Sequence, residues 1–127
     1  MAYYQPEIET ASREQIHAWQ EERFLKTFHR VWKNNAYYRQ KMIDAGLSDK
    51  DVTSLADLQK LPFLTKDDLR EAYPFGLMSA PLSDCVRIHS TSGTTGKRVI
   101  AFYTENDLAL WDDICARAIV AAGGTRD

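Results

Sequence analysis

The residues best suited to chemistry in this 127-residue chain lie in one segment, from Ser90 to Lys97. The segment contains five hydroxyl side chains, two glycines and a final lysine, in the order Ser90-Thr91-Ser92-Gly93-Thr94-Thr95-Gly96-Lys97. Glycine lets the backbone adopt positive φ and approach a ligand closely, and successive N–H groups in such a turn form a concave anion-binding surface. Hydroxyl groups and an ammonium group add donors and charge that suit phosphate oxygens. These residue types together favour a polyphosphate ligand.

Composition alone leaves a second interpretation of this segment open. It is also typical of a flexible β-hairpin loop, because such loops are rich in serine, threonine and glycine. The Walker A phosphate loop does not fit, since Thr91 stands where its first glycine is required and Arg98 follows the lysine. The glycine fingerprint of dinucleotide-binding folds is absent as well.

Two short strands are predicted to hold the segment in place. Residues 85–89 alternate in the manner of a strand, and residues 99–103 form a β-branched and aromatic run. An amphipathic helix is expected from about residue 105 to residue 122. Two strands and a helix make a poor self-contained sheet. The pattern therefore predicts the opening of an α/β domain over residues 81–127, with its remaining strands missing.

A mainly helical region is predicted over residues 1–80. After an irregular lead over residues 1–11, Ser12 and Gln15 have the spacing of a capping box that opens a long helix. Asn34-Asn35 predicts a break, and a second helix over residues 36–45 ends at Gly46. The long helix carries apolar residues at helical spacing, namely Phe24, Leu25, Phe28, Val31 and Trp32.

Three Ser/Thr-x-x-Asp signals predict the starts of further helices, because each can form a capping box. They are Ser54-Leu55-Ala56-Asp57, Thr65-Lys66-Asp67-Asp68 and Thr104-Glu105-Asn106-Asp107.

The string from Thr91 to Lys97 closely resembles the signature loop of the adenylate-forming superfamily, which includes acyl-CoA synthetases, peptide-synthetase adenylation domains and luciferases. The wider context, over about residues 12–122, resembles phenylacetate–coenzyme A ligases. The supporting stretches are Leu61-Pro62-Phe63-Leu64-Thr65-Lys66-Asp67-Asp68-Leu69-Arg70, Tyr73-Pro74-Phe75-Gly76-Leu77, Arg87-Ile88-His89 and Asn34-Asn35-Ala36-Tyr37-Tyr38-Arg39. Two positions depart from that family's pattern, with Ala36 and Arg98 standing where proline is usual.

The resemblance implies an α/β fold, in which a helical N-terminal region precedes the first strands and a helix of an incomplete adenylate-forming N-terminal domain. It implies an enzyme that joins an aryl carboxylic acid to the AMP part of ATP, with Mg²⁺, and then transfers the acyl group to coenzyme A. The loop from Ser90 to Lys97 would hold the β- and γ-phosphates. No acid–base catalyst is assigned, because the attacking carboxylate is already ionised. No protein metal ligand is assigned either. The later motifs of such ligases are absent, so this piece alone is expected to be inactive.

Charge and hydropathy exclude other classes of function. The formal net charge is −2 and the pI is near 5.9, so a nucleic-acid partner is not expected. No stretch approaches the roughly 20 apolar residues that a membrane helix needs. No signal peptide is recognisable either, which predicts a cytoplasmic protein with no membrane partner. Cys85 and Cys115 lack metal-ligand spacing and are expected as small buried apolar residues.

A non-catalytic alternative also stays open. The chain could be a dimerisation or interaction module that packs an aromatic stripe against another copy, and a homodimer is compatible with either function. The stripe consists of Trp19, Phe24, Phe28 and Trp32. His89, one residue before the loop, is expected to be a strand-end side chain with a local partner.

Overall fold

The computed structural model of the chain describes residues 3–93 and 98–125, which form helices and a two-stranded antiparallel sheet. The α-helices are α1 (Pro6–Glu9), α2 (Arg13–Asn34), α3 (Ala36–Asp44), α4 (Lys66–Glu71) and α5 (Glu105–Ala121). Two 3-10 helices, η1 (Leu55–Lys60) and η2 (Leu82–Asp84), precede the strands β1 (Cys85–Ser90) and β2 (Ile100–Thr104). The predicted order of helices, strand, loop, strand and helix is confirmed.

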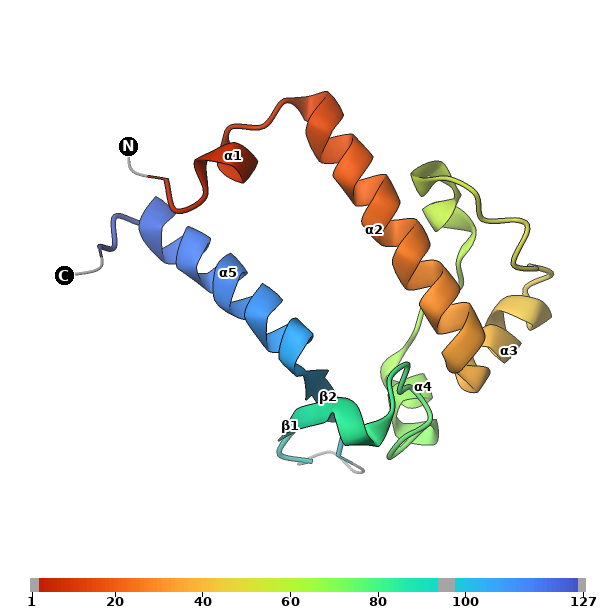
Figure 1. Cartoon of the computed structure of the whole chain (residues 1–127). Coiled ribbons are helices and arrows are strands. Elements are labelled where there is room, and N and C mark those ends of the chain that lie inside the picture. Colours follow the sequence, from red (N-terminus) through yellow and green to blue (C-terminus); the bar gives the residue numbers. More distant parts are fainter. Residues whose placement is uncertain (1–2, 94–97, 126–127) are drawn as a thin grey trace.

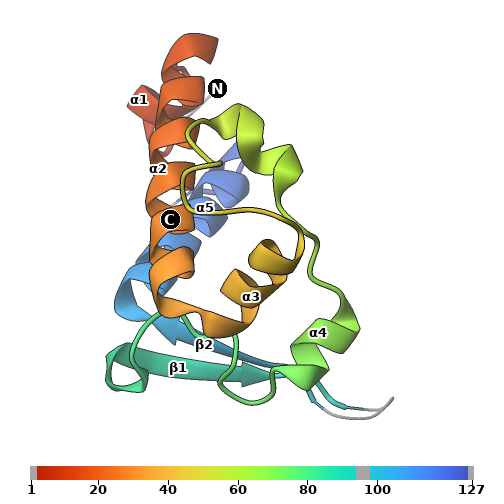
Figure 2. The ribbon, with the colours of Figure 1, turned by 90° about the vertical axis from the view of Figure 1, so that its right-hand side faces the viewer.

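The two long helices, α2 and α5, lie as separate rods whose lower ends approach the hairpin of β1 and β2 (Figure 1). The view turned by 90° shows the hairpin extending beneath α2 and α3 towards α4 (Figure 2). Residues of α4 and β2 line a common groove of about 390 Å³, so the start of β2 lies against the helical region.

The prediction of an irregular lead over residues 1–11 is wrong, because residues Pro6–Glu9 form the short helix α1. Pro6 stands in the first turn, where the missing N–H of proline costs nothing. The Glu9 carboxylate accepts hydrogen bonds from the N–H groups of Tyr4 (2.9 Å) and Gln5 (2.7 Å). Arg117 on α5 donates to the side-chain oxygen of Gln5, which ties α1 to α5.

The apolar core lies between α2, α3 and the segment that follows them. Phe28, Met42 and Val52 are buried at its centre. Partly buried residues pack around them, namely Phe24, Leu25, Trp32, Tyr38, Leu47 and Leu61. Most of the aromatic stripe of α2 therefore packs within this chain. Less of its surface is left for contact with another copy.

The junction between α2 and α3 is held by polar contacts. Asn35 is buried, and its side-chain oxygen caps α3 by accepting from the Tyr38 N–H at 2.9 Å. Arg39 donates to the carbonyl oxygens of Trp32 (2.8 Å) and Lys33 (3.1 Å), which would otherwise lack partners at the end of α2. The predicted break at this point is confirmed.

A second polar cluster fixes α4 to α3. Asp68 is buried and accepts hydrogen bonds from Lys41 and from the Tyr37 hydroxyl (3.0 Å). It also completes the capping box of α4 with Thr65. The Lys41 ammonium and the Thr65 N–H and hydroxyl hold the pKa of the Asp68 carboxyl far below its ordinary value.

The chain leaves much of its surface exposed. Its accessible area is 9415 Å², whereas a compact monomer of 14.5 kDa exposes about 6,900 Å². Large apolar residues on β1 and α5 account for part of the excess, and no residue of α5 is buried. Cys115 is exposed and Cys85 half-buried, so the expectation of two buried cysteines is wrong. None of the described helices has the length and apolar composition to cross a membrane.

Candidate functional site

The segment singled out in the sequence connects β1 to β2, and the register of the hairpin fixes where it starts. His89 pairs with Ala101, and Ser90 pairs with Ile100. Beyond the sheet, the Thr91 N–H donates to the Val99 carbonyl at 3.0 Å. The Val99 N–H donates in return to the Thr91 hydroxyl at 3.1 Å. The hairpin interpretation is thus confirmed for the connection, and it does not exclude phosphate binding by the loop it closes.

The structure locates half of the predicted phosphate-binding residues. Ser90 ends β1, and Thr91 and Ser92 follow it with exposed side chains. The Ser90 hydroxyl donates to the Thr91 carbonyl at 3.1 Å. Thr94, Thr95, Gly96 and Lys97 lie outside the described residues.

Gly93 adopts the backbone conformation for which glycine is suited. Its φ is 70°, in the left-handed region that side chains with a Cβ adopt only at a steric cost. A left-handed residue within a turn directs neighbouring N–H groups towards one side, which is the geometry of anion-binding nests. The described part of the loop is therefore compatible with the predicted anion site.

α5 follows β2 without a linker. Thr104 is both the last residue of β2 and the N-cap of α5, and its hydroxyl accepts from the Asp107 N–H. The Asp107 carboxylate accepts from the Thr104 N–H (2.9 Å) and hydroxyl (2.8 Å), and the N–H contact lowers the pKa of Asp107. This reciprocal cap sets the angle at which α5 leaves the strand.

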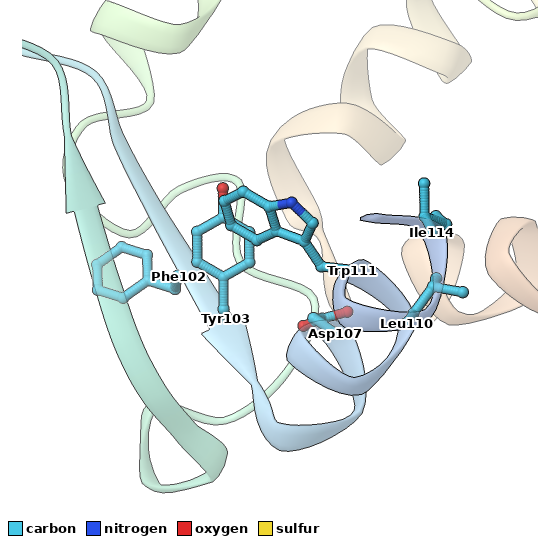
Figure 3. Close-up of a pocket in the computed structure, with 6 residues that line it drawn as sticks. All are labelled: Phe102, Tyr103, Asp107, Leu110, Trp111 and Ile114. Atoms are coloured by element: carbon cyan, nitrogen blue, oxygen red, sulfur yellow. The ribbon is translucent and has the colours of Figure 1, made fainter. Parts of the chain in front are cut away.

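Three aromatic rings gather on the face of the hairpin that α5 covers. The His89 ring centroid lies 4.9 Å from that of Tyr103 and 5.6 Å from that of Trp111. Tyr103 and Trp111 are 5.5 Å apart. Figure 3 shows the Tyr103 and Trp111 rings close together, beside a groove of about 390 Å³ that runs along α5. The expectation of a local partner for His89 is confirmed.

The sequence did not reveal this aromatic group as a unit. Tyr103 lies diagonally across from His89, because Ala101 is the direct partner of His89 and side chains two residues apart share a face. Trp111 joins them from α5. The sequence placed His89 and Tyr103 on predicted strands and Trp111 on a predicted helix. Only the observed strand register and the ring contacts show that the three rings meet.

Within residues 3–93 and 98–125, no group of three or more His, Cys, Asp or Glu side chains could hold a metal ion. Among the described residues, Ser90, Thr91 and Ser92 carry hydroxyl groups at the start of the loop.

Comparisons with known proteins relate the whole chain to a family. No protein-family model matches the chain. The chain is 43% identical over 120 residues to a phenylacetate-coenzyme A ligase of Thermus thermophilus, a match that covers 94% of the chain and 27% of that ligase. Its identity to the ligase of the same name from Escherichia coli K12 is 44% over 118 residues, which covers 93% of the chain and 27% of the ligase.

A solved structure is similar as well. The crystal structure of a 2-hydroxyisobutyryl-CoA ligase, in complex with 2-HIB-AMP and CoA in the thioesterification state, matches with a TM-score of 0.79 at 28% identity. The match covers 91% of this chain and 25% of that protein. The chain thus spans about a quarter of the length of the proteins that it resembles in sequence and fold.

Four phenylacetate-coenzyme A ligases are 41–44% identical over 92–94% of the chain, which includes the loop and both strands. The chain belongs to the phenylacetate–coenzyme A ligase family and matches the N-terminal region of its members.

Proposed function

We propose that this chain is the N-terminal part of an ATP-dependent coenzyme A ligase for an aryl, phenylacetate-like carboxylic acid. The observation that carries the proposal is the 41–44% identity to four phenylacetate-coenzyme A ligases along nearly the whole chain. A role in phenylacetate breakdown, a cytoplasmic location and a division of the chain between residues 80 and 81 belong to the same proposal.

The reaction has two steps. A carboxylate oxygen of the acid attacks the α-phosphorus of ATP, the bond to the bridging oxygen of the β-phosphate breaks, and pyrophosphate leaves. The thiol of coenzyme A then attacks the carbonyl carbon of the acyl-adenylate, loses its proton and displaces AMP. The first step is an in-line displacement at phosphorus, so positioning and charge stabilisation dominate its rate.

The loop acts on the leaving pyrophosphate in this proposal. The hydroxyls of residues 90–95, the backbone at both glycines and the Lys97 ammonium bind the β- and γ-phosphates of ATP, which enters as its Mg²⁺ complex. The positive φ of Gly93 and the closed base between Thr91 and Val99 support this assignment. No side chain of the chain is needed as a general base, because the acid is ionised when it attacks.

A hybrid ligase tests the proposed function. In it, this chain replaces the matching segment of the Escherichia coli ligase, to which it is 44% identical. Isotope exchange between pyrophosphate and ATP, stimulated by phenylacetate, reports the first step, and thioester formation reports both steps. The hybrid should catalyse both, and the isolated chain neither. A folded hybrid without exchange would show that the chain does not supply a working ATP loop.

A further inference from the structure

The rings of His89, Tyr103 and Trp111, here called the aromatic triad, link the strand that enters the loop to the helix that follows its exit. Each ring contacts the other two, with centroid separations of 4.9, 5.5 and 5.6 Å. The planes of His89 and Trp111 are inclined by 70°, the edge-to-face arrangement that aromatic pairs prefer. The triad therefore joins β1, β2 and α5 at one point.

Local structure sets where the three rings meet. Ala101 lies opposite His89 in the sheet, and its small side chain leaves room for the His89 ring to reach Tyr103. Trp111 is held on a helix whose first turn is capped by Thr104, the residue directly after Tyr103. The relative placement of Tyr103 and Trp111 is thus set by a short, continuous stretch of chain.

Backbone pairing also holds the entrance of the loop, because Ser90 pairs with Ile100 and Thr91 exchanges hydrogen bonds with Val99. Ser90, Thr91 and Ser92 are exposed, and the hydrogen bonds between Thr91 and Val99 are open to competition from water. His89 is half-buried and directly precedes Ser90. Its packing against Tyr103 and Trp111 supplies a side-chain contact one residue before the loop.

We propose that the aromatic triad positions the phosphate loop by holding its entrance at a fixed place relative to α5. This inference rests on the proposed function, since it concerns how the same loop is used. The three side chains are positioning residues and do not touch the phosphates. A displacement of about 1 Å at a reacting group lowers rates on the order of 100-fold. Loss of a ring contact in the triad should therefore weaken the use of ATP while the domain stays folded.

Variants of the hybrid ligase test the triad. His89→Ala and Trp111→Ala should each raise KM for ATP about 10-fold, while thioester formation from supplied acyl-adenylate stays within about 2-fold. His89→Phe keeps a ring at this position and should restore KM to within about 3-fold of the unmodified hybrid. Addition of Mg²⁺-ATP should change the fluorescence of Trp111, measured as the part lost in Trp111→Phe, and His89→Ala should abolish that change.

A matched control uses the ring contact of Phe102, the residue before Tyr103 on β2. Phe75 packs against Phe102 at 5.5 Å, a contact similar in size to those of the triad, but it holds the segment after α4 instead of the loop entrance. Phe75→Ala should lower the melting temperature without changing KM for ATP.

The outcomes separate the two proposals. If the unmodified hybrid shows no exchange, the proposed function fails and the triad proposal falls with it. If the hybrid is active and the triad variants keep its KM, only the triad proposal fails. Equal losses in both half-reactions, or a KM increase in Phe75→Ala as large as in His89→Ala, would reduce the triad to a general stabilising cluster.

Discussion

At the scale of single residues, Gly93 bears most directly on the shape of the loop. Its φ of 70° is in the region where an added Cβ meets the following carbonyl oxygen. Gly46, at the end of α3, has a similar φ of 81°, and a Cβ added there would meet nothing within 4 Å. The two glycines therefore share a backbone requirement but only Gly93 belongs to the proposed phosphate site.

Substituting Gly93 and Gly46 in parallel tests the loop, with Gly46 as the matched control. Gly93→Ala and Gly46→Ala should each lower the free energy of unfolding by roughly 1–2 kcal/mol, since both force alanine into the left-handed region. In the hybrid ligase, only Gly93→Ala should also raise KM for ATP. Chemical denaturation measures the first effect and steady-state kinetics the second. Equal kinetics for the two variants would remove Gly93 from the ATP site.

Lys97 and its neighbour Arg98 allow a second comparison. In the proposal, Lys97 stabilises the charge that builds on the leaving pyrophosphate, and Arg98 is not assigned to the phosphates. Lys97→Ala in the hybrid should lower pyrophosphate exchange by about 100-fold or more, with thioester formation from supplied acyl-adenylate nearly unchanged. Arg98→Ala removes one positive charge at the next position and should change either rate by less than about 3-fold. A similar loss in both half-reactions for Lys97→Ala would contradict the assignment.

At the scale of elements, local sequence signals were sufficient where the stabilising contacts are local. Ser12, Ser54, Thr65 and Thr104 all form the predicted capping boxes. Each box uses residues three positions apart, so its chemistry is visible in the sequence. The break at Asn35 and the helix stop at Gly46 follow the same logic.

Contacts between residues far apart in the chain could not be predicted from the sequence in the same way. The bond from Arg117 to Gln5 spans most of the chain, and it accompanies the short helix α1 that the sequence did not predict. The aromatic triad depends on strand register, which one residue of slippage would change completely. The loop's residue types indicated phosphate chemistry, but its anchorage required the observed pairing of His89 with Ala101.

The Asp68 carboxylate and its hydrogen-bond donors should make the stability of the helical region depend on pH. The pKa of Asp68 is lower in the folded chain than in the unfolded one, chiefly because Lys41 donates to it. Its stabilising contribution is therefore present above the unfolded pKa of about 3.9 and is lost as the pH falls below that value. Urea unfolding between pH 7 and pH 3 should show this loss.

Two variants isolate the contribution of Asp68. Asp68→Asn should be less stable at pH 7 and should show a weaker decline towards pH 3. Asp67 provides the control, since its side chain is 90% exposed and pairs with Arg70 on the surface of α4. Asp67→Asn should follow the unmodified protein at every pH. A pH profile of Asp68→Asn that is parallel to that of the unmodified protein would show that Asp68 does not cause the decline.

At the scale of the whole molecule, the described chain has a small core and a large open surface. Its accessible area exceeds that of a compact protein of the same mass by roughly a third. Val86, Ile88 and Ile119 are each more than half exposed, and they lie on β1 and α5. In the structurally similar ligases this chain corresponds to about a quarter of the protein, and we expect that the remaining polypeptide covers these residues.

The isolated chain should reveal this surface. It should bind a hydrophobic dye such as ANS and associate increasingly with concentration, because exposed apolar strands and helices pair with one another. The hybrid ligase should bind little dye at the same concentration. Light scattering after size-exclusion chromatography also tests directly whether the isolated chain forms a homodimer. A dye-free, monomeric and cooperatively unfolding isolated chain would contradict this description of its surface.

The position of the triphosphate of ATP decides whether this loop is the phosphate site. A crystal structure of the hybrid ligase with Mg²⁺ and a non-hydrolysable ATP analogue measures this directly. The β- and γ-phosphate oxygens should lie within hydrogen-bonding distance, about 2.7–3.2 Å, of backbone and hydroxyl groups between residues 90 and 97. A triphosphate bound elsewhere, with this loop free of contacts to it, would contradict the central claim.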